Sequence, residues 1–172
     1  MSKIITVHCG DITQLTVDVI VNAANAQLAG GGGVDGAIHR AAGPELYVAC
    51  RKIGGCPTGE VRVTPAFNLS AKAIFHAVGP VWHGGKQGEA ELLASCYRQC
   101  MNLLEQKSFA SIAFPAISCG VYGYPIEQAA RIAVKEVRQA AEKIDCLSKV
   151  IFCCFDELTA NYYRQALAET PR

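Results

Sequence analysis

An amide and a carboxylate flank a run of four glycines near the start of the chain. Asn25 lies before residues 30–33, which are all glycine, and Asp35 follows them. Glycine loses more backbone entropy on ordering than any other residue and adds no side-chain packing, so we expect this backbone to approach a ligand closely. Free N–H groups at the start of a helix attract anions, phosphates above all. We predict that Asn25 and Asp35 face one ligand across the loop; the alternative is a flexible turn with a helix cap.

A second uncharged segment, residues 115–125, is a candidate partner for the glycine run. It contains Gly120 and Gly123 and has no charged side chain. Backbone N–H groups from two facing glycine-rich loops can hold a diphosphate from both sides. The chain lacks Gly-x-x-x-x-Gly-Lys-Ser/Thr, and it lacks a Gly-x-Gly-x-x-Gly with an acidic ribose ligand at the expected distance. These absences argue against a nucleoside triphosphatase and against a nicotinamide-dependent dehydrogenase.

Strands and helices alternate along the chain and must position these two loops. Short apolar or alternating runs predict strands at about residues 4–8, 17–21, 61–65, 73–78, 111–114 and 149–154. Helical spacing predicts helices at about residues 34–42, from Pro44, at 89–106, from Pro125, and after Glu157. Thr13 is predicted to cap a short helical turn after the first strand. This alternation indicates a layered α/β fold.

Three candidate ligand segments each follow a predicted strand. They begin at Asn22, Pro115 and Phe155. Ligands of α/β folds bind beyond the carboxyl ends of the strands, so we expect the three segments to meet at one edge of the sheet. In the loop after Pro80, Trp82 is a packed aromatic, a surface anchor or, with His83, part of a mobile lid; packing is the more common outcome for such a residue.

Length and composition limit the classes of protein to consider. The 172 residues, of which 51% are hydrophobic and 18% charged, fit one globular domain spanning 1–172. The net charge of +1 argues against broad binding to nucleic acid. No apolar run approaches the roughly 20 residues of a membrane span, and the N-terminus lacks a signal peptide. We therefore expect a cytoplasmic protein.

Cysteine and histidine usage gives no indication of a metal site. The nine cysteines include no Cys-x-x-Cys pair, which argues against a zinc ribbon and against a disulfide framework. Cys96 and Cys100 lie on the apolar face of a predicted helix and are expected to be buried. The four histidines lack metal-ligand spacing. We expect neither a metal nor a cofactor.

From Gly10-Asp11-Ile12-Thr13 to Phe155, the chain resembles the macro domain family, specifically its bacterial O-acetyl-ADP-ribose deacetylase type. The matching motifs are Val21-Asn22-Ala23-Ala24-Asn25, residues 30–39, Val78-Gly79-Pro80, Phe114-Pro115-Ala116-Ile117-Ser118 and Gly120-Val121-Tyr122-Gly123. The resemblance implies a three-layer α/β/α sandwich around a mixed β-sheet. It also implies that ADP-ribose binds in a cleft across the strand ends.

The resemblance also implies roles for individual residues. Asp11 accepts a hydrogen bond from the adenine amino group, Ile12 lines the adenine pocket, and Phe155 lies against adenine. The diphosphate and the distal ribose are held by Gly33, Val34, Ser118, Cys119, Gly120, Val121 and Tyr122. Asn25 orients the distal ribose and Asp35 positions the attacking water.

The implied activity is hydrolysis of the ester on the distal ribose of O-acetyl-ADP-ribose. A carboxylate at a helix N-terminus is stabilised in its charged form, so we expect Asp35 to aim the water more than to take its proton. The same site could remove ADP-ribose from Asp or Glu side chains of proteins. Other possibilities are a non-catalytic ADP-ribose-binding module and a regulator that binds RNA or a protein partner.

One position departs from the family pattern. Cys119 stands where members of this type usually carry Thr. If backbone N–H groups bind the ligand at this loop, the change costs little. A nucleophilic cysteine is the rival hypothesis, and it is disfavoured because the sequence supplies no adjacent histidine base.

Overall fold

A six-stranded sheet forms the centre of the structure, a computed structural model that describes residues 3–169. The strands are β1 (Ile4–Cys9), β2 (Val19–Ala23), β3 (Val61–Pro65), β4 (Ala73–Ala77), β5 (Ser111–Phe114) and β6 (Lys149–Cys154). Their order across the sheet is β1-β6-β5-β2-β4-β3. Neighbouring strands are parallel except β3, which pairs antiparallel with β4. The sheet is therefore mixed, as predicted.

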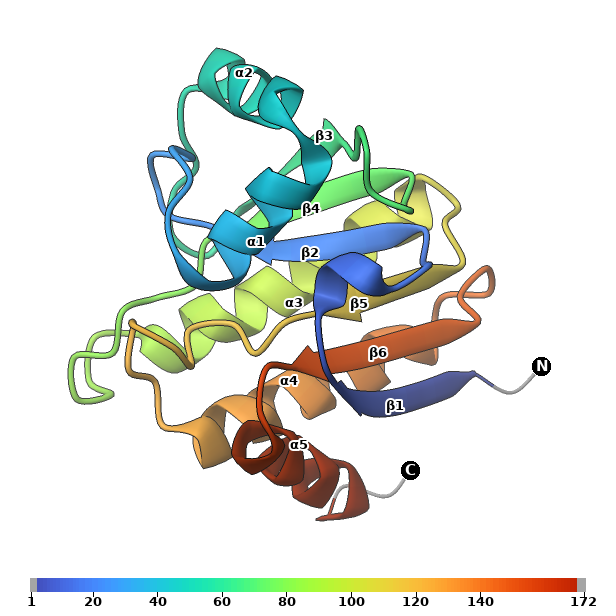
Figure 1. The fold of residues 1–172 in the computed structure, drawn as a ribbon. Coiled ribbons are helices and arrows are strands. Elements are labelled where there is room, and N and C mark those ends of the chain that lie inside the picture. Colours follow the sequence, from blue (N-terminus) through green and yellow to red (C-terminus); the bar gives the residue numbers. More distant parts are fainter. Residues whose placement is uncertain (1–2, 170–172) are drawn as a thin grey trace.

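Helices cover both faces of the sheet (Figure 1). The 3-10 helix η1 (Ile12–Gln14) and helices α1 (Gly33–Ala42) and α2 (Pro44–Ile53) cover one face; α3 (Glu89–Gln106), α4 (Ile126–Ala141) and α5 (Glu157–Glu169) cover the other. Side chains alternate along each strand, so Val19 and Val21 pack toward α3, α4 and α5, whereas Ile20 packs toward α1 and α2. This arrangement confirms the three-layer α/β/α sandwich.

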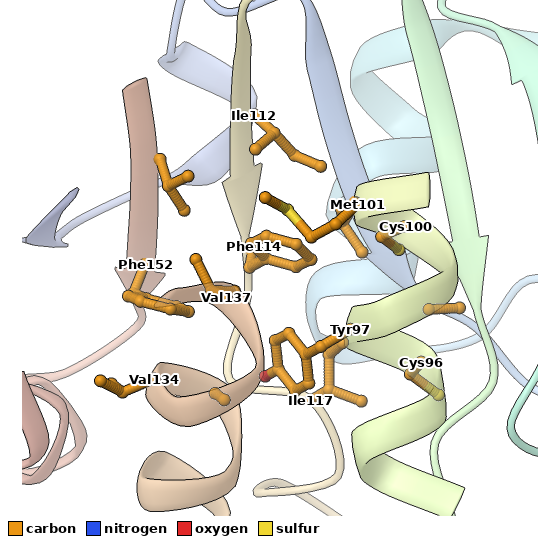
Figure 2. Packing of buried hydrophobic residues seen from close by; sticks show 14 of the residues in the cluster. Cys96, Tyr97, Cys100, Met101, Ile112, Phe114, Ile117, Val134, Val137 and Phe152 are labelled. Carbon is orange, nitrogen blue, oxygen red and sulfur yellow. The ribbon is translucent and has the colours of Figure 1, made fainter. Parts of the chain in front are cut away.

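The larger apolar core lies under α3, α4 and α5. Figure 2 shows Tyr97 and Met101 of α3 against Phe114 of β5, with Phe152 of β6 beside it. The rings of Tyr97 and Phe114 are 5.0 Å apart, and those of Phe114 and Phe152 are 6.0 Å apart. Cys96 and Cys100 are fully buried in this cluster, as their helical spacing predicted.

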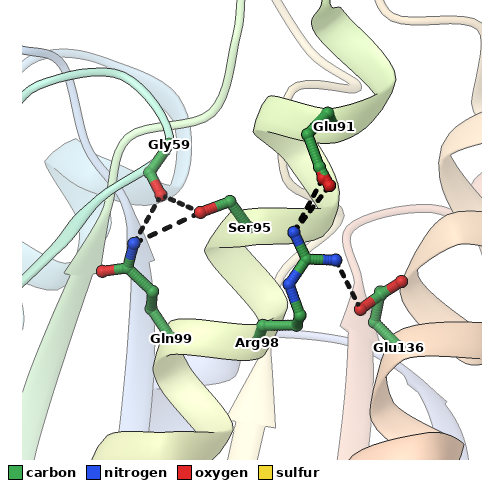
Figure 3. A network of polar contacts seen from close by, with 6 residues as sticks. All are labelled: Gly59, Glu91, Ser95, Arg98, Gln99 and Glu136. Carbon is green, nitrogen blue, oxygen red and sulfur yellow. Dashed lines mark hydrogen bonds and ion pairs between the residues drawn. The ribbon is translucent and has the colours of Figure 1, made fainter.

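Polar contacts fix α3 between the loop before β3 and the neighbouring helix (Figure 3). The hydroxyl of Ser95 donates to the carbonyl of Gly59 at 2.7 Å. On the other side, Arg98 pairs with Glu91 at 2.7 Å and with Glu136 of α4 at 3.1 Å. These contacts tie the middle of α3 to the loop before β3 and to α4.

Two of the sequence-based assignments needed correction. β2 covers Val19–Ala23 and not residues 17–21, so Asn22 is a buried strand residue and not part of the loop. Asp11, not Thr13, caps the short helical turn. Within residues 3–169, no helix is long and apolar enough to cross a membrane.

Candidate functional site

The carboxyl ends of β6, β5 and β2 are neighbours in the sheet. The loops that follow these strands therefore emerge at one edge, together with the loop after β4 (Figure 1). The ends of these three strands carry Asn22, Pro115 and Phe155. The three predicted ligand segments therefore lie at one edge of the sheet, as expected.

The glycine run enters α1 with its backbone open. Gly33, the first residue of α1, has a φ of +58°, which a side chain would strain. Apart from chain neighbours, no described residue has an atom within 4 Å of a β-carbon built at Gly32 or Gly33. A β-carbon at Gly36, in contrast, would lie 2.5 Å from the carbonyl oxygen of Gly31. The loop thus packs closely against α1 at Gly36 and leaves space beside Gly32 and Gly33, at the start of the helix where free N–H groups occur.

Asp35 is buried at the start of α1, with 6% of its surface exposed. Its Oδ1 accepts a hydrogen bond of 2.8 Å from Nδ2 of Asn22. Nε2 of His39, one helical turn later, lies 3.4 Å from the same oxygen. The other oxygen, Oδ2, lies 3.5 Å from the point where a β-carbon on Gly31 would be. One carboxylate oxygen is therefore held inside, and the other faces the glycine loop.

Asn25 shapes the loop that it begins. Its Nδ2 donates to the carbonyl of Gly30 at 2.9 Å, and its Oδ1 accepts from the N–H of Ala29 at 3.1 Å. Nδ2 also lies 3.8 Å from the position of a β-carbon built on Gly31, the same position that lies 3.5 Å from Oδ2 of Asp35. The structure thus brings Asn25 and Asp35 to the same glycine. Each amide atom of Asn25 has one further hydrogen-bonding position for a ligand.

The second loop is joined to the loop after β4. The hydroxyl of Ser118 donates to the carbonyl of Pro80 at 2.7 Å, and the N–H of Trp82 donates to the carbonyl of Tyr122 at 2.9 Å. The ring of Trp82 packs on that of Tyr124 at 4.7 Å. Trp82 is therefore a packed aromatic in this structure. Between these ties the side chain of Val121 is fully exposed.

A buried carboxylate holds the loop that contains Trp82 and His83. Glu89, the first residue of α3, accepts hydrogen bonds from the N–H groups of His83, Gly85 and Gln87 at 2.8, 3.1 and 2.7 Å. Burial raises the pKa of Glu89, but the backbone N–H groups outweigh it and lower this pKa to about 2. The charged carboxylate fixes the turn that supports Trp82.

The thiol of Cys119 is turned toward the sheet and α5. Its sulfur contacts the carbonyl of Ile117 at 3.5 Å and the hydroxyl of Tyr163 at 4.0 Å. Burial raises the pKa of this thiol to about 11, against a small lowering by Tyr163. A thiol that stays protonated at neutral pH is a poor nucleophile, which counts against the nucleophilic-cysteine hypothesis.

The residues expected at adenine follow the two neighbouring strands β1 and β6. The N–H of Gly10 donates to the carbonyl of Cys154 at 2.9 Å, so the two strand ends lie side by side. Oδ1 of Asp11 accepts from the N–H and the hydroxyl of Thr13 at 2.9 and 2.7 Å. Ile12 is buried and Phe155 is 94% exposed. Asp11 and Phe155 thus share one edge of the sheet.

Sequence reasoning gave no separate role to three polar residues around Asp35. Asn22 was expected to begin a ligand loop and was given no contact with Asp35, and its burial on β2 became evident only from the fold. The sequence could have predicted that His39 lies beside Asp35, because a residue four positions later lies on the same face of a helix. His76 on β4 is fully buried; burial, and then the charge of His39, lowers its pKa to about 4.

Comparison with known proteins identifies the family. The macro domain family model matches residues 21–133. A macro domain-containing protein of Chlorobaculum tepidum is 59% identical, covering 92% of each chain. A Salmonella newport protein named O-acetyl-ADP-ribose deacetylase is 57% identical over 98% of this chain and 97% of its own.

Solved structures agree with this assignment. The Oceanobacillus iheyensis macrodomain with ADP has a TM-score of 0.91 and 46% identity, covering 95% of this chain and 89% of its own. The Trypanosoma brucei macrodomain in complex with ADP-ribose has a TM-score of 0.90 and 42% identity, covering 95% and 68%. The open glycine loop and the strand-end site thus occur in a chain that belongs to the macro domain family.

Proposed function

We propose that this chain binds ADP-ribose and hydrolyses O-acetyl-ADP-ribose to ADP-ribose and acetate. The observation that carries the proposal is the buried carboxylate of Asp35, held by Asn22 at 2.8 Å beside the open N-terminus of α1. The name of the Salmonella relative and the ADP-ribose complex of the Trypanosoma macrodomain support the choice of substrate.

The ligand lies across the strand ends in this proposal. Adenine occupies the edge formed by Asp11, Ile12 and Phe155, whose exposed ring offers a stacking surface. The diphosphate lies between the start of α1, at Gly33 and Val34, and residues 118–122. With a net charge of only +1, the chain holds this anion chiefly through backbone N–H groups.

The distal ribose lies beside Asn25 and Asp35 in the proposed complex. Asp35 holds a water through Oδ2, because Oδ1 is already bonded to Asn22. This water adds to the acetyl carbonyl carbon, the bond from that carbon to the ribose oxygen breaks, and the proton released by the water replaces the acetyl group on that oxygen. In this proposal Asp35 acts chiefly by positioning the water, with help from the substrate's own phosphate.

Acetate release by wild type and by Asp35→Ala tests the mechanism. We expect the variant to lose on the order of 10²–10⁴-fold in turnover, the usual contribution of such a group, with ADP-ribose affinity by calorimetry nearly unchanged. Asp145→Ala is the matched control, because Asp145 is exposed in the turn before β6, at the opposite end of the sheet. An equal loss of binding and turnover in Asp35→Ala would make Asp35 a binding residue.

Other outcomes of this assay distinguish the alternatives. ADP-ribose bonded to an Asp or Glu side chain is also a ribose ester, so release of ADP-ribose from a modified protein, faster than from the metabolite, would identify a protein substrate. ADP-ribose binding without any ester hydrolysis would indicate a non-catalytic module or a regulator with a protein partner. RNA binding with a steep salt dependence would indicate phosphate contacts.

The proposed setting is a single macro domain, residues 1–172, in the cytoplasm. All nine cysteines are free thiols. Four of them lie near the candidate site: Cys9 ends β1, Cys153 and Cys154 end β6, and Cys119 lies in the second loop. Free thiols in this number are typical of proteins from reducing compartments.

A further inference from the structure

A line of buried polar side chains lies behind Asp35. It consists of Thr64 on β3, His76 on β4 and Asn22 on β2, with 3%, 0% and 0% of their surfaces exposed. β3, β4 and β2 are consecutive in the sheet, and the three side chains lie on the face covered by α1 and α2. Buried polar groups are costly unless they are hydrogen-bonded. In each hydrogen bond along this line, the donor and the acceptor can be assigned.

The direction is set at Pro65, whose carbonyl oxygen can only accept a hydrogen bond. The hydroxyl of Thr64 donates to that oxygen at 3.0 Å, which uses its one proton. The lone pairs of Thr64 Oγ1 are left to accept from Nε2 of His76, 2.9 Å away. Nε2 of His76 therefore carries the proton of the neutral ring, and Nδ1 carries a lone pair.

The same direction of donation holds as far as Asn22, whose amide nitrogen donates both to His76 and to the carboxylate of Asp35. Nδ1 of His76 accepts from Nδ2 of Asn22 at 3.1 Å, and the second proton on that nitrogen goes to Oδ1 of Asp35 at 2.8 Å. Turning the amide of Asn22 over would place its oxygen against the carboxylate. The two acceptors thus fix the orientation of Asn22, and they do so although Asn22 Oδ1 finds no hydrogen-bond partner within residues 3–169.

Two further groups, Cys50 and His39, contact this line, and neither changes the assignment of donors and acceptors. The sulfur of Cys50 lies 3.9 Å from Nε2 of His76; burial raises the pKa of this thiol to about 11, and a neutral thiol is a weak hydrogen-bonding group beside the Thr64 oxygen at 2.9 Å. His39 approaches Asp35 from α1 at 3.4 Å. Its charge, after the larger effect of burial, lowers the pKa of His76 to about 4, which keeps the ring of His76 neutral.

We propose that Thr64 and His76 are positioning residues for Asp35: the Thr64 hydroxyl selects the Nε2-protonated ring of His76, and this ring orients the amide of Asn22 that holds the carboxylate. Neither residue touches substrate in this arrangement. The consequence for turnover rests on the proposed function, whereas the protonated nitrogen of His76 is independent of it.

Thr64→Val tests the catalytic part, because valine has the shape of threonine and lacks the hydroxyl. The ring of His76 then loses the acceptor that fixes its protonated nitrogen, and a misplacement of about 1 Å in a catalytic group can cost on the order of 10²-fold. We expect kcat for acetate release to fall by about 10-fold or more, with KM and ADP-ribose affinity within about twofold of wild type. Thr64→Ser keeps the hydroxyl and should recover most of the turnover.

Two results would overturn the catalytic part. One is a Thr64→Val protein with wild-type kcat; the other is a loss in kcat that Thr64→Ser shares. Thermal unfolding of both variants separates this effect from a loss of folded protein, since kcat is compared per folded molecule.

Nitrogen NMR of the imidazole rings tests the structural part without any substrate. The His76 ring of wild type should give the signals of a neutral ring protonated at Nε2, unchanged between pH 5.5 and 8, and Thr64→Val should shift them toward the other protonated nitrogen; His76→Gln assigns the signals. Protonation of His76 at Nδ1 in wild type would overturn the proposal even in an active deacetylase. Signals of a ring protonated at Nε2, in a protein that releases no acetate, would support the assigned protonation of His76. This outcome would contradict only the proposed function.

Discussion

The two faces of the sheet are built from the same strands but have different roles. Toward α3, α4 and α5, β2 and β4 present Val21 and Phe75, which join a large apolar core. Toward α1 and α2, the next residues of the same strands, Asn22 and His76, form a buried polar line that ends on Asp35. One face therefore supplies most of the hydrophobic stabilisation, and the other combines a smaller core with the groups that hold the candidate catalytic carboxylate.

Removing apolar volume from the larger core should give the largest change in stability. Leu104 of α3 is fully buried in it, and Leu→Ala changes in cores cost about 2–5 kcal/mol. We expect Leu104→Ala to lower the free energy of unfolding by that amount, measured in denaturant, with kcat per folded molecule unchanged. A reduced kcat in the folded fraction would show that the two faces do not act separately.

Acid should destabilise the polar face through His76. The pKa of this ring is lowered from 6.5 in the free side chain to about 4, first by burial and then by His39. Between these values the unfolded chain binds a proton that the folded chain does not, so the free energy of unfolding decreases as the pH falls from 6.5 toward 4. The loss should reach about 3 kcal/mol, because one pKa unit corresponds to about 1.4 kcal/mol.

Denaturant unfolding at pH 7, 5.5 and 4.5 measures this loss, and His76→Gln is the control that should flatten the slope. An equal slope in both proteins would assign the pH dependence elsewhere. Glu89 does not interfere in the same window: its pKa, raised by burial but lowered more strongly by backbone N–H groups, is about 2. Its contribution is present above pH 4.5 and is lost only as the pH falls toward 2.

Cys119 should give the smallest effect, although it lies in the second loop. Its thiol contacts Ile117 and Tyr163 on the side of the larger core, and its raised pKa keeps it protonated. We expect Cys119→Thr to keep kcat and ADP-ribose affinity within about twofold, because the backbone of the loop is unchanged. Loss of turnover in Cys119→Thr, with ADP-ribose still bound, would revive the nucleophilic-cysteine hypothesis.

The accuracy of the sequence-based predictions followed the strength of the local pattern. The helix at 89–106 was predicted with its observed ends because apolar residues recur on one face over many turns, and strand β5 is a short apolar run that ends before Pro115. β2 was placed two residues too early because Asn22 is polar, and a polar residue after an apolar run suggests a loop. The cap at Asp11 was assigned to Thr13 because both residue types cap helices and the two lie close in sequence.

By itself, the sequence determined the alternation of strands and helices, the glycine run before α1, and the pairing of Asn25 and Asp35 around it. These features are local, since they depend on residue types within a few positions of one another. The order of the strands was decided only by the tertiary structure, and it placed Asn22, His76 and Thr64 in one line although they are far apart in the chain. Neighbours in a sheet are set by how the whole core packs, so no local pattern could show that this buried line ends on the carboxylate of Asp35.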